Sequence, residues 1–477
     1  MDISQLLNDI NDFVWGPIML ALLVGTGIFL TIRLKFLPWR NLIWYSVKLI
    51  FRKKAKHEGD ISPFQSLMTA LSATVGTGNI VGVATAMVLG GPGAIVWMWI
   101  SAAFGLSTKY AESVLAVKYR ETNSVGEMAG GPMYAMKNGI GGTFGRVMAA
   151  LFAFFAVCAS FGIGNMTQAN SIAAALNTSF EIPTWITGVA LTILALAVLM
   201  RGIRSIGKVS SIIVPSMAAF YLVVTLIVII VNFEHVPSGI MTMISMAFST
   251  EAVAGGVGGS IVATMLTAMR WGVARGVFSN EAGLGSAPIA AAAARTDHAS
   301  RQGYVNMTGT FFDTMIICML TGLVIASSGM LGAVDLETGQ LVSGAQLTIL
   351  AFSTVFGEWA KVIVSVSLAL FAFSTILGWE YYGEKSLEYL VSNRKVIYFY
   401  RAFFSCITFI GATQTLDVVW NFSDTMNGLM AIPNLLCLLI LNKDVANECF
   451  QYQEAVVEKE KLGEDIDYNA DLHGSTH

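Results

Sequence analysis

The sequence predicts an all-helical polytopic membrane protein with about eleven transmembrane helices. Apolar residues make up 55% of the 477 residues, and charged residues make up only 12%. A soluble domain carries roughly twice that charged fraction. The apolar residues also come in long runs, and Ile212–Val231 reaches the length of about 20 residues that a membrane span needs. Composition and run length together favour a protein built inside a bilayer.

The order of apolar runs and polar breaks predicts a single membrane domain over residues 1–445. The expected spans cover residues 14–32, 64–90, 93–117, 146–176, 183–200, 208–232, 239–272, 303–326, 357–381, 396–411 and 416–441. The apolar stretch Val342–Val355 is shorter and is expected to form a helix that caps the outer face. Residues 446–477 are polar and acidic and are expected to form a disordered cytoplasmic tail.

Loop charges predict the orientation of the chain in the membrane. The segment between the first two spans carries eight basic residues against Glu58 and Asp60, which is typical of a cytoplasmic loop. Further basic residues lie in the predicted inner loops: Lys118, Arg120, Arg201, Arg204, Lys208, Arg270, Arg275, Arg295, Arg394 and Lys395. The predicted outer segments lack Lys and Arg, with Lys361 near the outer end of the ninth span as the exception. We therefore expect the N-terminus outside and the C-terminus inside.

Two of the predicted spans contain a polar, Gly-rich break near the middle, at Thr74–Asn79 and at Ala254–Gly259. Unwound backbone at that depth is stable only where it lines a cavity, because its polar groups need partners. Free N–H groups suit a carboxylate, and free C=O groups suit a cation or an ammonium group. Two breaks five spans apart predict a transporter site between five-helix repeats over 64–232 and 239–441, with 14–32 as an extra helix. Tight helix packing is the alternative explanation for the glycines.

Polar side chains inside spans give further candidates. Asn165 and Gln168 are three residues apart and share a helix face, so their amides suit a zwitterion or a contact between helices. Ser374 and Thr375 supply adjacent hydroxyl oxygens, which suit a hard cation such as sodium unless they bond to their own helix. Trp379 follows Thr375 by four residues and is placed to wall a small pocket.

Two acids are weaker candidates for a functional role. Glu251 precedes the second break and is placed to meet a substrate amine or a proton, or to cap the span in water. Asp313 lies inside the eighth span, and its role stays open. The sequence contains no catalytic motif and no metal-ligand cluster of the familiar kinds, and its five cysteines form no CxxC pair. We therefore expect no enzyme, no organic cofactor, no nucleic-acid partner and no obligatory protein partner.

Four motifs carry a family resemblance: GDISPFQSLMTALSATVGTGNIVGVATA (59–86), GGPMYAM (130–136), GIGNMTQANSIA (162–173) and RGVFSNEAGLGSAPIAAAAA (275–294). The chain resembles the alanine or glycine:cation symporter family of bacteria and archaea from about residue 10 to 445. The resemblance implies a LeuT-type fold, two inverted five-helix repeats plus one extra helix. It also implies sodium-coupled import of a small neutral amino acid across a prokaryotic inner membrane by alternating access. A proton-coupled transporter of another small solute, a sensor or a channel remain alternatives.

The resemblance also implies roles for individual residues. N–H groups at the first break would hold the substrate carboxylate, carbonyls at both breaks would hold its amine, and two side chains would limit its size. The substrate residues implied are Ala73, Thr74, Thr77, Gly78, Gln168, Gly255, Gly256 and Trp379. One sodium site would use three backbone carbonyls and two hydroxyls, and an amide would belong to a second sodium site. The sodium ligands implied are Ser72, Val75, Asn79, Phe371, Ser374 and Thr375.

Overall fold

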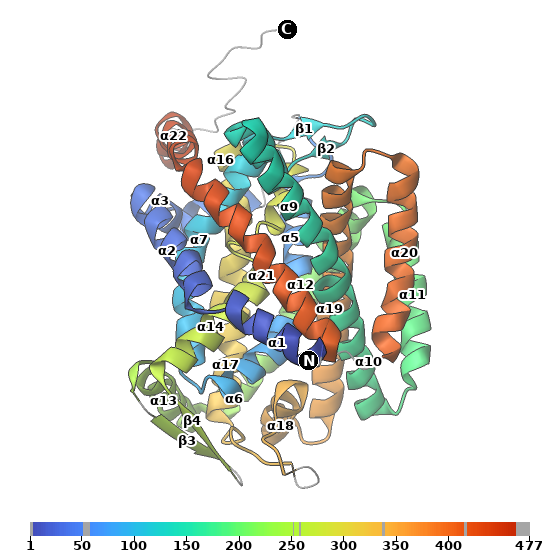
Figure 1. Cartoon of the computed structure of the whole chain (residues 1–477). Helices are drawn as coiled ribbons and strands as arrows, with labels where there is room; N and C mark the ends of the chain where they lie inside the picture. Colours follow the sequence, from blue (N-terminus) through green and yellow to red (C-terminus); the bar gives the residue numbers. More distant parts are fainter. Residues whose placement is uncertain are drawn as a thin grey trace.

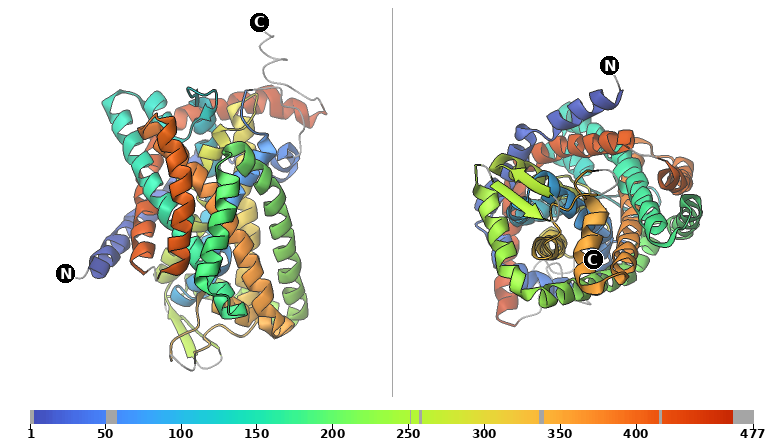
Figure 2. Two further views of the ribbon diagram at one scale, coloured as in Figure 1. Left: turned by 90° about the vertical axis from the view of Figure 1, so that its right-hand side faces the viewer. Right: turned by 90° about the horizontal axis from the view of Figure 1, so that it is seen from below.

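The computed structural model describes residues 3–50, 58–250, 252–256, 259–335, 339–414 and 417–463. Long helices run along one common direction and form a bundle, and two short hairpins lie at its opposite ends (Figures 1 and 2). One hairpin joins β1 (Glu121–Thr122) to β2 (Met128–Ala129), and the other joins β3 (Ala252–Gly256) to β4 (Gly259–Ala263). The two hairpins therefore mark the two ends of the molecule.

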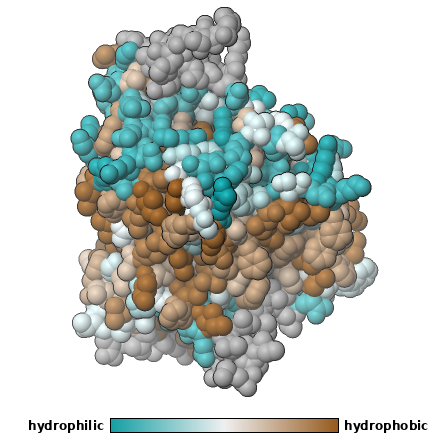
Figure 3. Space-filling view, turned by 45° about the horizontal axis from the view of Figure 1, so that its top comes forward, coloured by the Kyte–Doolittle hydropathy of each residue, from teal (hydrophilic) through white to brown (hydrophobic). Residues whose placement is uncertain are grey.

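On the face seen in Figure 3, a broad apolar zone lies next to a strongly hydrophilic end. Exposed apolar side chains of the helices include Ile18, Ile193 and Ile230, which are 78%, 60% and 69% exposed. Such residues are stable in lipid but not as a continuous surface in water. Seven described helices are long and apolar enough to cross a membrane, and an eighth span is the bent pair Pro63–Thr74 and Gly78–Leu89. The predicted polytopic membrane protein is confirmed.

The first half of the chain includes the long helix α2, which packs against α7 and α21. Its helical elements, including π-helical turns labelled η, are α1 (Ile3–Val14), α2 (Pro17–Arg33), α3 (Leu37–Arg40), η1 (Leu42–Ser46), α4 (Val47–Ile50), α5 (Pro63–Thr74), η2 (Gly78–Gly82), α6 (Val83–Leu89), α7 (Ala94–Lys118), α8 (Pro132–Ala135), η3 (Met136–Ile140), α9 (Gly142–Phe161), η4 (Gly162–Met166), α10 (Thr167–Phe180), α11 (Thr184–Leu199) and α12 (Ile203–Val231).

The second half of the chain ends with a set of short helices after α21. Its helical elements are η5 (Phe233–His235), α13 (Val236–Phe248), α14 (Met265–Asn280), α15 (Ala287–Ala292), α16 (Ala299–Thr310), η6 (Phe311–Cys318), α17 (Met319–Ser327), α18 (Gly344–Phe356), α19 (Trp359–Leu390), α20 (Arg394–Thr413), α21 (Asp417–Ile440), α22 (Asn442–Tyr452), η7 (Gln453–Val457) and α23 (Glu458–Lys461). The element η5 is a 3-10 turn. The helix α18 occupies the stretch that the sequence assigned to an outer cap.

The predicted seventh span over 239–272 is not one helix. The helix α13 ends at Phe248, and the chain then forms the β3–β4 hairpin at the lower end of Figure 1. The two strands pair antiparallel, with Gly256 opposite Gly259. Glycine permits the tight chain reversal of a hairpin, and it disfavours a continuous helix. A capping box between Thr264 and Thr267 then starts α14. The Gly-rich segment therefore separates two helices instead of interrupting one.

The charged residues Arg270 and Arg275 lie inside α14 and not in an inner loop as predicted. The Arg270 guanidinium contacts the Asp12 carboxylate at 2.5 Å, and the Arg275 guanidinium lies 3.7 Å from the Asp424 carboxylate. Each arginine thus has an acid from another part of the chain, which offsets its charge within a spanning helix. The periodicity of the sequence could not reveal these long-range partners.

The segment from residue 446 to Lys461 is helical and not disordered as predicted. The helix α22 packs on α7 and α16, and the Glu448 carboxylate contacts the Lys118 ammonium at 2.9 Å and the His298 ring at 3.1 Å. The Tyr452 hydroxyl lies 2.8 Å from the Tyr45 hydroxyl, which joins this segment to η1. These partners explain how a polar, acidic sequence becomes ordered; the last residues of the predicted tail lie outside the described residues.

Candidate substrate and ion site

The first helix of the first repeat is broken where the sequence predicted. A capping box at Ser62 and Gln65 starts α5, and the chain leaves helical geometry at Val75, so the two half-helices meet at an angle of 50°. The Gly76 N–H donates to the Asn79 side-chain oxygen at 2.8 Å. The N–H groups of Thr77 and Gly78 stand at the start of the second half-helix, where intrahelical acceptors are missing. The break therefore presents backbone donors inside the bundle.

Close neighbours explain the glycines of this break. A Cβ atom at Gly76 would lie 2.3 Å from the Thr375 hydroxyl oxygen and 3.5 Å from the Gln168 side-chain oxygen. A Cβ atom at Gly78 would lie 3.2 Å from the Cα atom of Ser279. The broken segment thus lies against α10, α14 and α19 at once, and any larger residue at Gly76 would displace Thr375.

The second interrupted helix consists of α14 and α15, with its break at Glu281–Ser286. Positive φ angles occur at Glu281, Gly283 and Gly285, which unwinds the chain between the two half-helices. The motif at 275–294 contains these glycines, but their role as the break was missed because the longer Gly run at 254–259 masked it. The sequence signal that marks them is a Gly-x-Gly pair directly after the last turn of an apolar helix.

Side chains of α7 and α21 stabilise this second break. The Glu112 carboxylate accepts hydrogen bonds from the Gly283 N–H at 3.0 Å and from the Asn434 amide at 2.7 Å. The Asn434 amide also donates to the Gly283 carbonyl at 2.9 Å, and the Lys109 ammonium donates to the Asn280 carbonyl at 2.7 Å. Backbone groups that the helix leaves free are thereby paired with buried side chains.

The Asp313 carboxylate connects the two interrupted helices. One of its oxygens accepts from the Asn79 amide at 2.8 Å, and the other accepts from the Ser279 hydroxyl at 2.8 Å and the Thr314 hydroxyl at 2.6 Å. Asn79 belongs to the first broken helix, Ser279 to the second, and Asp313 to η6 between α16 and α17. A fully buried acid with three donors around it is a positioning group for both breaks.

Most residues of the predicted hydroxyl and carbonyl sodium site lie together. Both hydroxyls donate to the Phe371 carbonyl of their own helix, Ser374 at 2.8 Å and Thr375 at 3.1 Å. The Ser374 hydroxyl also lies 3.2 Å from the Ser72 carbonyl of α5. Val75 directly precedes Gly76, which Thr375 contacts. Neutral oxygens gathered in this way provide the ligands that a hard monovalent cation prefers. Asn79 is separate from this group, because its side chain points to Asp313 instead.

Gln168 and Trp379 lie beside the first break. The Gln168 amide donates to the Ile163 carbonyl at 2.9 Å, and its side-chain oxygen is buried with no hydrogen-bond partner among the described residues. The indole of Trp379 packs directly on Gly164, where a Cβ atom would lie 2.3 Å from the Trp379 Cβ atom. An open acceptor close to the first break suits a small molecule that carries an ammonium group.

Other predicted substrate residues differ in their positions. Ala73 packs against Gly378, and the Thr77 hydroxyl is buried without a described partner, whereas the Thr74 hydroxyl bonds to its own helix at the Leu71 carbonyl. Gly255 and Gly256 lie in the β3–β4 hairpin at the end of the molecule (Figure 1), away from the first break. They do not join the site, and Glu251 lies outside the described residues.

The helix α18 lies toward the end that carries the β3–β4 hairpin (Figure 1). Its Thr348 hydroxyl donates to the Ile80 carbonyl at 3.2 Å. Ile80 belongs to the π-helical turn that follows the first break. A movement of α18 would therefore displace the turn that follows the first break.

The opposite end, which carries β1, β2 and α22, is called the basic end here because Lys118, Arg120, Arg204 and Arg295 lie there. The Arg120 guanidinium donates to the carbonyls of Ala292 and Ala294, at 3.0 and 2.7 Å, and to the Glu58 carbonyl at 3.0 Å. These bonds hold the start of α5 against the end of α15.

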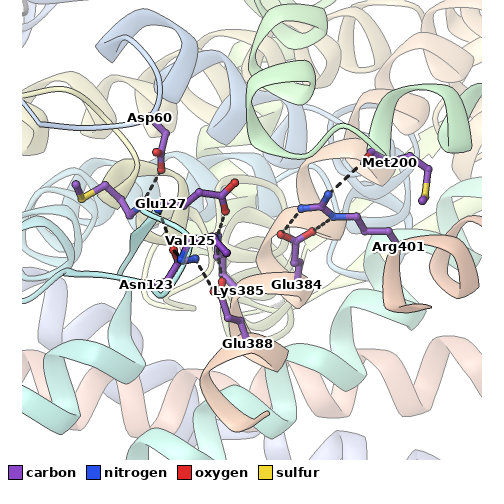
Figure 4. A network of polar contacts seen from close by, with 10 residues as sticks. Asp60, Asn123, Val125, Glu127, Met200, Glu384, Lys385, Glu388 and Arg401 are labelled. Carbon is purple, nitrogen blue, oxygen red and sulfur yellow. Dashed lines mark hydrogen bonds and ion pairs between the residues drawn. The ribbon is translucent and has the colours of Figure 1, made fainter. Parts of the chain in front are cut away.

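A second polar network lies at the basic end, between the β1–β2 hairpin and the ends of α19 and α20 (Figure 4). The Lys385 ammonium contacts Glu127 at 3.1 Å and Glu388 at 2.8 Å, and the Arg401 guanidinium takes both oxygens of Glu384. Burial opposes ionisation of Glu127, but the Lys385 charge outweighs it and lowers the pKa of that carboxyl. These ion pairs join the hairpin to α19 and α19 to α20 at the basic end.

Sequence comparison identifies the family of this chain. The model of the sodium:alanine symporter family matches residues 1–466. The chain belongs to the sodium:alanine symporter family. Sodium/alanine symporter AgcS of Methanococcus maripaludis is 51% identical over 457 residues, which cover 95% of this chain and 98% of that protein. Amino-acid carrier protein AlsT of Bacillus subtilis is 34% identical over 469 residues, which cover 98% of this chain and 95% of that one.

A solved structure supports the fold of this symporter family member. The transporter MhsT in complex with L-phenylalanine matches with a TM-score of 0.54 at 10% identity, covering 83% of this chain and 99% of MhsT. The predicted LeuT-type fold is confirmed by this match. Membership of the family carries the predicted function, sodium-coupled symport of alanine or glycine, and does not favour the proton-coupled, sensor or channel alternatives. The family is one of transporters and not of enzymes.

Proposed function

We propose that the chain binds a small neutral amino acid at the first break, between Gln168 and Trp379. The N–H groups of Thr77 and Gly78 receive the carboxylate, because they head a half-helix with no intrahelical acceptor. The side-chain oxygen of Gln168 accepts from the ammonium group, which gives that buried atom its missing partner. Trp379 leaves room for a short side chain only. The unpartnered Gln168 oxygen beside the break is the observation that carries this assignment.

The coupling sodium ion binds next to the substrate, at the carbonyls of Ser72, Val75 and Phe371 and the hydroxyls of Ser374 and Thr375. The contact of the Ser374 hydroxyl with the Ser72 carbonyl at 3.2 Å supports this assignment, because it brings oxygens of α5 and α19 together. An ion there links α5 to α19 across the break, and so favours one conformation of the broken helix. Asn79 is better placed to support Asp313 than to bind this ion.

Transport then requires the two ends to open in turn. Opening at α18 admits sodium and substrate, and opening at the basic end releases them. We assign the basic end to the cytoplasm of a prokaryotic cell and the α18 end to the outside, because the basic residues between spans gather at the first. The N-terminus is then outside, and the helices after α21 are cytoplasmic. The lipid bilayer is the only other partner that this arrangement needs.

The function is tested by alanine uptake into proteoliposomes under an imposed inward sodium gradient. We expect accumulation that stops when an ionophore dissipates the gradient, because the ion and the substrate share one closed site. Glycine and serine serve as competing substrates, and phenylalanine serves as a large control that Trp379 excludes. Uptake that persists unchanged without a sodium gradient would contradict the coupling, and equal uptake of phenylalanine would contradict the pocket.

A further inference from the structure

The side chain of Glu380 stands out because no proposed step uses it. It lies in α19 and is 0% exposed, and both of its carboxyl oxygens lack a hydrogen-bond partner among the described residues. A carboxylate ion without a partner in such surroundings is strongly disfavoured, because its charge has lost the solvation that water provides. A bound proton removes the charge, so the buried position favours the neutral acid.

The charged neighbours of Glu380 are already committed to other groups. Glu384 follows one helical turn later on the same face of α19, and both of its oxygens are held by Arg401 of α20, at 2.5 and 2.8 Å. The Lys385 ammonium contacts Glu127 and Glu388. Among the groups that face Glu380 from α20, the Tyr400 hydroxyl pairs with the Ser160 hydroxyl at 2.9 Å. The Arg401 guanidinium thus offsets the charge of Glu384. The neighbouring Glu380 carboxyl is neutral only when it carries a proton.

A route for the proton leads to the basic end. A cavity of about 640 Å³ opens there, and Glu384 and Arg401 line it (Figure 4). Glu380 lies one helical turn deeper than Glu384, about 6 Å along the helix axis. The next residue toward the middle of α19 is Trp379, whose side chain packs against Gly164. Along α19, Glu380 therefore lies between Glu384 of the cavity wall and Trp379 of the proposed substrate site.

We propose that Glu380 is a proton-binding site that exchanges with the cavity at the basic end and controls the closure of that end. When the O–H bond of the Glu380 carboxyl breaks, the proton passes to water in the cavity and the carboxylate remains in the helix. That carboxylate competes with Glu384 for the Arg401 guanidinium and loosens the contact between α19 and α20. A proton on Glu380 therefore stabilises the closed basic end, and its loss favours opening.

The test compares sodium-driven uptake at several pH values inside the vesicles, with the outside pH fixed. In the wild-type protein uptake is expected to fall as the basic side becomes acidic, because protonated Glu380 keeps that end closed. Glu380→Gln mimics the protonated acid and is expected to lose this dependence while still binding substrate. Glu358→Gln, which changes an exposed acid at the residue just before α19, is the control and keeps the wild-type profile. A Glu380→Gln profile identical to wild type would overturn the proposal.

A second measurement does not depend on transport. Infrared difference spectra of the purified protein, recorded between alkaline and acidic buffers, report protonated carboxyl groups directly. We expect a carbonyl band of a buried carboxylic acid in wild type that is missing in Glu380→Gln and retained in Glu358→Gln. A spectrum in which Glu380→Gln keeps every wild-type carboxylic-acid band would overturn the site. If Glu380→Gln fails to fold, Glu380→Asp replaces it and is expected to shift the band, and an unshifted band overturns the site as well.

Discussion

Single residues decide how closely the broken helix approaches its neighbours. Gly76 has no side chain because the Thr375 hydroxyl occupies the place of a Cβ atom, at 2.3 Å. Gly82, six residues further on, has only the Thr77 carbonyl within reach, at 4.0 Å. The two glycines look alike in the sequence and differ only in what surrounds them. Substituting each of them by alanine therefore tests whether the site needs a residue without a side chain at that position.

Gly76→Ala is expected to abolish sodium-driven alanine uptake, because the new methyl group displaces Thr375 from the proposed sodium site. Gly82→Ala is the matched control and is expected to keep uptake near the wild-type level. Uptake in proteoliposomes and sodium binding by calorimetry are the measurements. Full activity in Gly76→Ala would show that the contact with Thr375 is not required.

Thr375→Ala removes one proposed sodium ligand without changing the fold of α19. We expect the sodium concentration for half-maximal uptake to rise about tenfold, the equivalent of one lost polar contact of about 1.4 kcal/mol. The choice between alanine and glycine should stay the same. Ser367→Ala is the control, because Ser367 bonds only to its own helix at the Ile363 carbonyl in the described structure. An unchanged sodium requirement in Thr375→Ala would remove this residue from the site.

At the scale of elements, the interrupted helices depend on a side chain from a third element. Asp313 of η6 accepts from Asn79 in the first broken helix and from Ser279 in the second. The sequence analysis left the role of this acid open, since nothing in the order of residues shows that two breaks meet it. The fold makes it the link between the repeats.

Asp313→Asn replaces one of the two carboxylate oxygens, which accept hydrogen bonds, by an NH2 group, which donates them. One of the hydrogen bonds from Asn79 or Ser279 is then lost. We expect the affinity for alanine and for sodium to fall by about tenfold or more, the equivalent of about 1.5–3 kcal/mol for a hydrogen bond to a charged group. Binding calorimetry with and without sodium measures both affinities. Asp9→Asn, an exposed acid of α1, is the control. If only one of the two affinities changes, Asp313 supports one site and not both breaks.

The helix α22 owes its position to charge pairs at the basic end. The hydrogen bond with His298 is the largest cause that lowers the pKa of Glu448, and the Lys118 contact adds to it. Burial opposes them, but the pKa still falls to about 2. A carboxyl with a lowered pKa stabilises the fold above its unfolded pKa, near 4.3, and loses that contribution as the pH falls toward 2. The pairing is therefore fully present at neutral pH.

Glu448→Gln is expected to destabilise the protein by about 1 kcal/mol at pH 7, because the group is partly exposed and screened by solvent. The difference from wild type should shrink as the pH falls below about 4, since the wild-type carboxyl then becomes protonated. Thermal unfolding in detergent at several pH values measures this. A destabilisation that stays constant down to the acidic limit would contradict a charge-based contact.

At the scale of the whole molecule, the two ends differ in construction. At one end α18 contacts the turn after the first break, and at the other polar bonds from Arg120 and the Figure 4 network join separate elements. We expect these contacts to close the two ends. Alternating access requires that each closure be weak enough to break in turn. Weakening one closure should therefore shift the molecule toward the state that opens there.

Arg120→Ala is expected to favour the state open at the basic end, because it frees the start of α5 from the end of α15. A cysteine at Ser66, whose hydroxyl bonds to the Ala290 carbonyl in that interface, should then react faster with a water-soluble thiol reagent. The background carries Cys406→Ser, since Cys406 is exposed. Arg146→Ala, in the cavity wall at the same end, is the control. Equal labelling of both variants would contradict a closing role for Arg120.

Much of this architecture follows from local sequence. Long apolar runs predict the spans, because every backbone group in a bilayer must be paired within a helix. The polar turn around Gly76 predicts a break, because its glycines and hydroxyl residues do not favour a continuous helix at that depth. The adjacent Ser374 and Thr375 mark a polar point on an apolar helix. Each of these signals lies within a few residues of the chain.

Other features exist only in the folded bundle. Composition favoured the Gly run at 254–259 as the second break, but the chain forms a hairpin there and unwinds at Glu281–Ser286. Asp313 accepts hydrogen bonds from Asn79 and Ser279, and Arg275 pairs with an acid of α21. These partners are too far apart in the sequence for periodicity to detect them. The sequence by itself determined a membrane protein with a broken first helix and a polar pair on α19. The tertiary structure alone decided where the second break lies and which buried charges meet, because those depend on contacts between distant segments.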